Sequence, residues 1–176
     1  VNVRHLPNLV STPDALPEYI TPKSVALFEK FRVYSELELK ARTEVLLENY
    51  SKVINIEALT MIDLVRKKIL PAVFRYTKDI CDTGASKEAM GITASVEKDL
   101  AAKLSSLTEG IYKETAVLEE KVIAAQEQEC GLPSARYYRD VVFAQMQTLR
   151  CIVDETETNV SEDIWPLPSY TTLLFS

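Results

Sequence analysis

Apolar side chains recur every three or four residues along three long stretches of the chain, a spacing typical of amphipathic helices. The stretches run from Ser35 to about Asp82, from about Ser95 to Glu129, and from about Ser134 to Thr158. A shorter helix is expected in front of them, from Thr21 to Phe31, and no stretch is typical of a β-strand. The pattern therefore predicts an all-α fold, an antiparallel bundle of three long helices plus a short N-terminal helix.

Residues that start, bend and stop helices refine these boundaries. Thr21, followed by proline, suits the N-cap of the short helix, and Ser35 with Glu38 has the spacing of a capping box. Pro71 lies inside the first long helix and should kink it, because proline removes one backbone hydrogen bond. The segment from Thr83 to Ala94 contains two glycines and predicts a turn with helical fragments.

Prolines crowd at both ends of the chain, which predicts three segments. Residues 1–20 form an irregular arm, residues 21–160 the helical bundle, and residues 161–176 an irregular tail of the same domain. The tail ends in an apolar run, whereas chain termini are usually polar and frayed. We expect the tail to dock on the bundle or on a partner through Trp165, Tyr170, Leu174 and Phe175.

Only four glycines and one histidine occur among the 176 residues. The glycines stand far apart, whereas Gly-rich phosphate-binding loops need several close together. The histidine, His5, lies at the start of the sequence. His-rich metal sites are therefore excluded, and most hydrolytic triads lose their usual base. The composition argues against a self-contained enzyme.

Charge and cysteine content bear on partners and compartment. The 20 basic and 26 acidic residues give a net charge of −6, which argues against nucleic acid as a partner. No stretch approaches the roughly 20 apolar residues that span a membrane, and no leader pattern opens the chain. Three widely spaced cysteines suit reduced thiols, so a cytoplasmic protein is expected. The sequence begins at Val1 without methionine, which suggests a piece of a larger protein.

The most apolar window, from Val53 to Val65, covers more than one side of its helix. Ile56 and Leu59 fall among its polar positions. A helix of this kind is either central in its bundle or also buried by a second partner. Both alternatives stay open, and Ile56 and Leu59 are candidate packing or interface residues.

Two polar clusters were candidates for chemistry. Asn55, Glu57 and Asp63 lie within the apolar window, but di-metal sites in bundles need Glu-x-x-His pairs, and no histidine is available. These residues are interpreted as buried hydrogen-bonding groups or contacts with a neighbour. The run from Arg136 to Asp140 mixes aromatic and basic residues, on which nucleotides can stack. The net acidity favours a capped helix start with salt bridges instead.

Several ordered blocks of the sequence are distinctive. They are the run from Arg42 to Asp63, Ile69-Leu-Pro-Ala72, Tyr137-Tyr-Arg-Asp140, Trp165-Pro-Leu-Pro-Ser-Tyr170 and, in the arm, Thr12-Pro-Asp-Ala-Leu16. Together they resemble the C-terminal region of type III glutamine synthetases, and the resemblance covers nearly the whole chain. The connection around Thr83 to Lys98 resembles that family least.

The resemblance implies a parent enzyme that joins glutamate and ammonia to form glutamine, using ATP and Mg or Mn. Enzymes of this type form dodecamers of two stacked hexamers, and their active-site domains lie upstream of the present segment. No catalytic, cofactor-binding or metal-binding residue is therefore carried over. A structural role in a bacterial cytoplasm is expected, with the chain's own catalytic domain and neighbouring subunits of a homo-oligomer as partners.

Two further hypotheses remain at this stage. One is a free-standing helical bundle that binds a partner protein as an interaction or regulatory module. The reading frame upstream of Val1 distinguishes that module from a synthetase fragment. The other is a small all-helical enzyme that works through arginines and carboxylates, and calorimetric titration with ATP or metal tests it.

Overall fold

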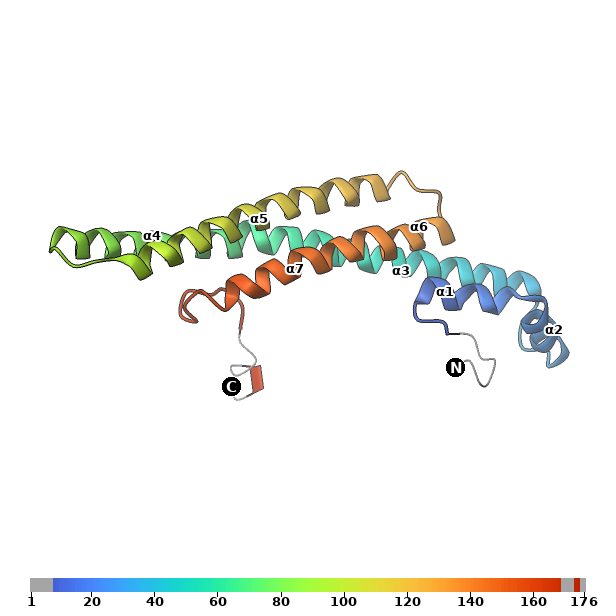
Figure 1. Cartoon of the computed structure of the whole chain (residues 1–176). Coiled ribbons are helices and arrows are strands. Elements are labelled where there is room, and N and C mark those ends of the chain that lie inside the picture. The colour runs from blue at the N-terminus through green and yellow to red at the C-terminus, as the bar shows by residue number, and fades with distance from the viewer. Residues whose placement is uncertain (1–7, 169–172, 175–176) are drawn as a thin grey trace. The chain divides into compact units, whose positions relative to one another are not determined.

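The computed structural model describes residues 8–168 and 173–174, and the regular structure throughout them is helical (Figure 1). No strand occurs in this part of the chain, which confirms the all-α prediction. The elements are α1 (Thr12–Ala15), the 3₁₀-helix η1 (Leu16–Ile20), α2 (Pro22–Lys30), α3 (Glu36–Leu64), the π-helix η2 (Val65–Ile69), α4 (Leu70–Ala89), α5 (Ser95–Ala125), α6 (Leu132–Tyr137), the π-helix η3 (Tyr138–Phe143) and α7 (Ala144–Glu157).

The arm is more regular than the sequence analysis predicts. Residues 12–20 form α1 and η1, so the expectation of an irregular segment over residues 1–20 is wrong for this part. Pro13 and Pro17 lie in the first turns of α1 and η1. Backbone N–H groups of a first turn have no intrahelical partner, so proline loses nothing there and its fixed φ favours the helix.

The capping box at the start of α3 forms as predicted. The Ser35 backbone N–H donates to Glu38 Oε2 at 2.8 Å, and the Glu38 N–H donates to Ser35 Oγ at 3.4 Å. Thr21 occupies the N-cap position of α2, and its carbonyl accepts from the Val25 N–H at 2.9 Å. Its hydroxyl does not cap the helix, because it donates to the Glu18 carbonyl at 3.0 Å.

Pro71 does not break the first long helix. The preceding turn, η2, widens to a π-helix, and the Leu70 N–H bonds to the carbonyl of Val65 instead of the residue four positions before it. Such a bulge accommodates the carbonyl that the proline ring would otherwise meet. The helix then continues as α4 to Ala89, beyond the predicted end at Asp82.

The turn after α4 is shorter than the sequence predicts. The expected loop from Thr83 to Ala94 is helical as far as Ala89. Gly84 is buried inside this helix, and a Cβ at this position would lie only 3.3 Å from Glu97 Cβ. The stop comes at Gly91, whose φ is 76°. Its N–H bonds to the Glu88 carbonyl and that of Ile92 to the Lys87 carbonyl, both at 2.9 Å, which is a Schellman motif.

Two glycine substitutions are expected to have opposite effects. Gly91→Ala forces an alanine into the left-handed region and should lower the free energy of unfolding by about 1 kcal/mol. Gly110 lies inside α5, where an added Cβ would be 3.7 Å from Ile152, an ordinary contact distance. Gly110→Ala should therefore raise the free energy of unfolding by about 0.5 kcal/mol. Chemical denaturation of both variants beside the wild type measures the difference, and equal effects would contradict the assigned backbone conformations.

The chain forms two compact units. Unit 1 comprises Val1–Glu57 and Lys121–Phe143, and unit 2 comprises Ala58–Glu120 and Ala144–Ser176. The predicted boundaries at residues 20 and 160 stay a prediction. In unit 1, a buried cluster joins η1, α3 and α6. Its members are Leu16, Leu47 and Ala135, with Tyr50 and Leu132 packed against them.

In unit 2, polar contacts fix the direction of the helices. Arg66 donates to both carboxylate oxygens of Glu119 at 2.9 and 2.5 Å, while Lys87 pairs with Glu97 at the other end. These two pairs place the stretch from η2 to α4 antiparallel to α5, as Figure 1 also shows. The buried apolar side chains of this unit include Ile62, Val65, Ile69, Val73, Ile80, Leu104, Ile111, Leu118, Met146, Leu149 and Val153.

The last helix of unit 2 also runs antiparallel to α5. Gln145 Nε2, early in α7, donates to Glu114 Oε2 at 2.6 Å. Glu155, near its end, pairs with Lys103 at 3.3 Å. Within unit 2 the helical stretches therefore alternate in direction, as the sequence predicts for the bundle.

Candidate functional site

Acidic and sulfur-bearing side chains do not gather into a metal site in the described part of the chain. No group of three or more His, Cys, Asp or Glu residues there could hold an ion. Within the apolar window, Asn55 accepts a hydrogen bond from the Tyr138 hydroxyl at 3.2 Å, and burial raises the pKa of that tyrosine. Glu57 is exposed, and Asp63 forms a surface pair with Lys67. The expectation of burial is therefore wrong for Glu57 and Asp63.

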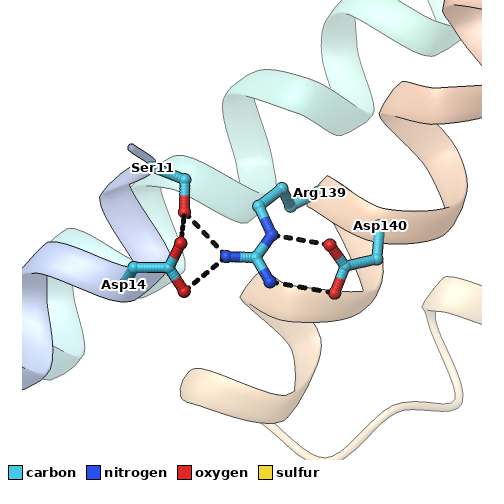
Figure 2. A network of polar contacts seen from close by, with 4 residues as sticks. All are labelled: Ser11, Asp14, Arg139 and Asp140. Carbon is cyan, nitrogen blue, oxygen red and sulfur yellow. Dashed lines mark hydrogen bonds and ion pairs between the residues drawn. The ribbon is translucent and has the colours of Figure 1, made fainter. Parts of the chain in front are cut away.

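Arg139 of η3 is the centre of a polar network in unit 1 (Figure 2). Its guanidinium binds Asp140 through two parallel hydrogen bonds, from Nε at 2.6 Å and from Nη2 at 3.0 Å. Its remaining terminal nitrogen, Nη1, lies 2.6 Å from Asp14 Oδ1 and donates to Ser11 Oγ at 2.7 Å. Ser11 Oγ in turn donates to Asp14 Oδ2 at 2.6 Å. The network ties the start of the arm helix α1 to η3.

Each carboxylate of this network is stabilised in its charged form. The hydrogen bond from Ser11 and then the contact with Arg139 lower the pKa of Asp14. The hydrogen bonds from Arg139 lower the pKa of Asp140, and both carboxylates raise the pKa of the guanidinium. Because two carboxylates already occupy the arginine, it offers no anion-binding site. Arg139 instead connects the start of α1 to η3, and we call the network of Ser11, Asp14, Arg139 and Asp140 the tether.

The salt bridges expected for Arg136 to Asp140 include the Arg139–Asp140 pair. The predicted side-chain cap at the start of this helix does not form. The helix begins at Leu132, and its N-cap residue, Gly131, has no side chain that could accept a hydrogen bond. The sequence indicates only the local part of this network, the contact between Ser11 and Asp14. Ser11 and Asp14 have capping-box spacing, but no local pattern links them to an arginine 128 positions away in the sequence.

Acidification is expected to loosen the tether. Asp14 and Asp140 have pKa values below the ordinary 3.8 in the folded state, so their stabilising contribution is fully present above that value. It is lost as the pH falls through the lowered folded pKa values. Hydrogen exchange of residues 11–15, compared between about pH 5 and pH 2, should show lost protection. Arg139→Gln should remove protection already at the higher pH, and unchanged protection in this variant would contradict the tether.

A groove of about 770 Å³ lies between η1, α2 and α3 in unit 1. Its aromatic wall contains Phe28, whose ring centroid is 6.4 Å from that of Tyr19 and 5.8 Å from that of Tyr34. The Arg42 guanidinium lies over the Tyr34 ring, 4.4 Å from its centroid. Apolar positions of α3, Val45 and Leu46, complete the lining.

Helix α2 has no buried residue, although several of its side chains are large and apolar. Leu27 is 54% exposed, and Phe31, which follows the helix, is 66% exposed. Contiguous apolar surface of this kind marks interaction sites in soluble proteins. The position of this helix follows from the sequence, whereas the exposure of its apolar face in the described chain does not.

The predicted interface residues fall into three groups. Ile56 is 62% and Leu59 48% exposed, both on α3. Trp165 is buried, with 8% of its surface exposed, and its Nε1 finds no acceptor among the described residues. Leu174 is 72% exposed, while Tyr170 and Phe175 lie outside the described residues.

Comparison with known proteins gives a consistent result. Residues 2–88 match the family model of the glutamine synthetase C-terminal domain. The chain is 34% identical to a glutamine synthetase of Butyrivibrio fibrisolvens and 32% identical to a type-3 glutamine synthetase of Dictyostelium discoideum. A glutamine synthetase of Bacteroides fragilis is 28% identical. Each similarity covers 98% of this chain.

The chain carries a glutamine synthetase C-terminal domain. It spans only about a quarter of the length of the curated relatives that it matches, 25%, 24% and 25% respectively. The resemblance read from the sequence is thereby confirmed.

The match to the glutamine synthetase C-terminal domain contains several of the exposed apolar surfaces of unit 1. Helix α2, the aromatic groove and the exposed positions of α3 all lie within residues 2–88. Arg139 and Asp140 lie outside that range. Separately, none of the described helices combines the length and the hydropathy needed to cross a membrane.

Proposed function

We propose that this chain is a non-catalytic part of a type III glutamine synthetase, which packs on the catalytic domain and contributes to oligomer assembly. The observation that carries the proposal is the uncovered apolar surface of α2 and of the adjoining groove in unit 1. The parent activity would be the ATP-dependent joining of glutamate and ammonia, with Mg or Mn. Its active site would lie in the part of the relatives' length that this chain does not cover.

Helix α2 is only nine residues long. An isolated helix of nine residues is marginal in water, because helices shorter than about 12 to 15 residues rarely hold by propensity alone. Tertiary contacts usually supply the missing stability. Helix α2 buries none of its residues within the described chain, so a surface outside this chain is the natural source of those contacts.

The share of the relatives that this chain does not cover supports our choice of partners. Three quarters of each related synthetase lies outside the matched region, and the catalytic domain is the proposed neighbour of α2. We further propose a homo-oligomer, a dodecamer of the type expected for these enzymes, in a bacterial cytoplasm. No nucleic acid or membrane partner is proposed, in keeping with the net charge of −6.

The test uses the full-length synthetase with Leu27→Ser and Phe31→Ser. Both side chains are more than half exposed in this chain, so the isolated domain should keep its free energy of unfolding within about 0.5 kcal/mol. Loss of two large apolar contacts should weaken domain docking by about 100-fold. Lower thermal stability of the catalytic domain and a smaller assembly by sedimentation velocity are the expected results. A variant that assembles and melts like the wild type would overturn the proposal.

A further inference from the structure

Helix α3 presents two apolar stripes within unit 1. Leu47 and Ile54 are buried, at 4% and 8% exposure, and face the core of the unit. A second stripe consists of Leu46, Val53 and Ile56, which are 48%, 44% and 62% exposed, with the exposed Asn49 between them. Leu46, at the N-terminal end of this stripe, also borders the groove beside α2. At 100° per residue, the second stripe is turned roughly 130° from the first. We name this second stripe the α3 seam.

The spacing of the residues in the α3 seam indicates that a helix packs against it. Positions 46, 49, 53 and 56 are separated by three, four and three residues, which is the spacing of a and d positions in a coiled coil. Knobs at this spacing fit the holes of another helix and not the face of a sheet. Asn49 lies at a d position in the middle of the seam, where burial of its amide favours the register in which it meets a hydrogen-bonding partner.

The charged residues beside the seam identify that helix. Lys52 and Glu57 flank Val53 on its two sides and are five residues apart, the spacing of g and e′ positions that pair between parallel helices. We propose that the α3 seam pairs in parallel with the α3 seam of a second copy of this chain. Two Lys52–Glu57 ion pairs and an Asn49–Asn49 contact then follow by symmetry. This inference rests on the proposed role in oligomer assembly and assigns one of its surfaces.

The present contacts of these charged groups leave them available for such pairing. Lys52 Nζ lies 2.7 Å from Glu48 Oε1, and the two side chains are 66% and 61% exposed. Exposed pairs of this kind contribute little to stability, so exchanging Glu48 for Glu57 of the second copy costs little. Glu57 is exposed as well.

Charge reversal tests the pairing without threatening the fold. In the full-length protein, Lys52→Glu alone and Glu57→Lys alone each place like charges opposite each other across the seam. Each should raise the dissociation constant of the seam contact by about tenfold at low ionic strength. An equimolar mixture of the two variants should restore association, because the carboxylate introduced at position 52 then faces the ammonium introduced at position 57. Sedimentation velocity and native mass spectrometry of the mixture measure the restoration.

Matched controls separate this surface from the docking of α2. Leu37→Ser, at a 79% exposed position of α3 outside the seam, should leave the assembly mass unchanged, while Val53→Ser should reduce it. Single charge variants that associate like the wild type, or a mixture that stays dissociated, would overturn the inference. The proposed function would survive that outcome if the Leu27→Ser, Phe31→Ser variant still lost docking.

Discussion

The full-length synthetase carrying Ile56→Ser and Leu59→Ser is expected to lose its native assembly while this domain stays folded. The two side chains are 62% and 48% exposed on α3, so they add little to the core of the chain itself. If a partner covers them, each substitution removes an apolar contact of about 1.5 kcal/mol or more. Together they should lower the association constant by about 100-fold, measured by sedimentation velocity over a dilution series.

The comparison with the isolated chain decides between the two interpretations of this helix. An interface role predicts that Ile56→Ser and Leu59→Ser change its free energy of unfolding by less than about 0.5 kcal/mol. A central core role predicts a loss of several kcal/mol. Leu37→Ser, at a position 79% exposed on the same helix, is the matched control and should preserve the assembly. A large unfolding effect with intact assembly would contradict the interface account.

Leu118→Ala is expected to produce a large loss of stability within the chain. Leu118 is 0% exposed, in the part of α5 that packs inside unit 2. Truncation removes buried methyl groups and leaves a cavity, which should lower the free energy of unfolding by about 3 kcal/mol. Urea denaturation followed by far-ultraviolet circular dichroism measures this loss.

The control for the Leu118 prediction lies on the same helix. Val96 is 72% exposed in the first turn of α5, and Val96→Ala should change the free energy of unfolding by less than about 0.5 kcal/mol. Similar losses for the two variants would mean that α5 is not packed in the register described for unit 2.

The sequence predicted helices well because each carries its own local signals. Apolar periodicity located α3, α5 and α7, and the Ser35–Glu38 capping box forms as expected. The errors arose where a residue's role depends on distant neighbours. Local pattern predicts a turn at Gly84, but this glycine lies inside α4 where the helix closely approaches Glu97 of α5. Pro13 suggested an irregular arm, yet it starts α1.

The candidate surfaces were only partly accessible to sequence reasoning. Periodicity singled out Ile56 and Leu59 as apolar residues on a polar side of α3, and both are exposed. The exposed face of α2 and the contact between Arg139 and Asp14 could not be inferred, because both depend on how the arm packs. Local spacing says which residues share a helix face, but the tertiary structure determines which face is left uncovered.

The most direct test of the account is hydrogen exchange of α2, Pro22–Lys30, in the full-length synthetase and in this chain alone. Among the described residues, α2 buries no side chain, so its amides should exchange rapidly in the chain alone. If the synthetase covers this surface, its amides should exchange at least about tenfold more slowly there, while those around Leu104 and Leu118 stay equally protected in both. Equally rapid exchange of α2 in both proteins would contradict the claim that this domain serves as a docking and assembly surface.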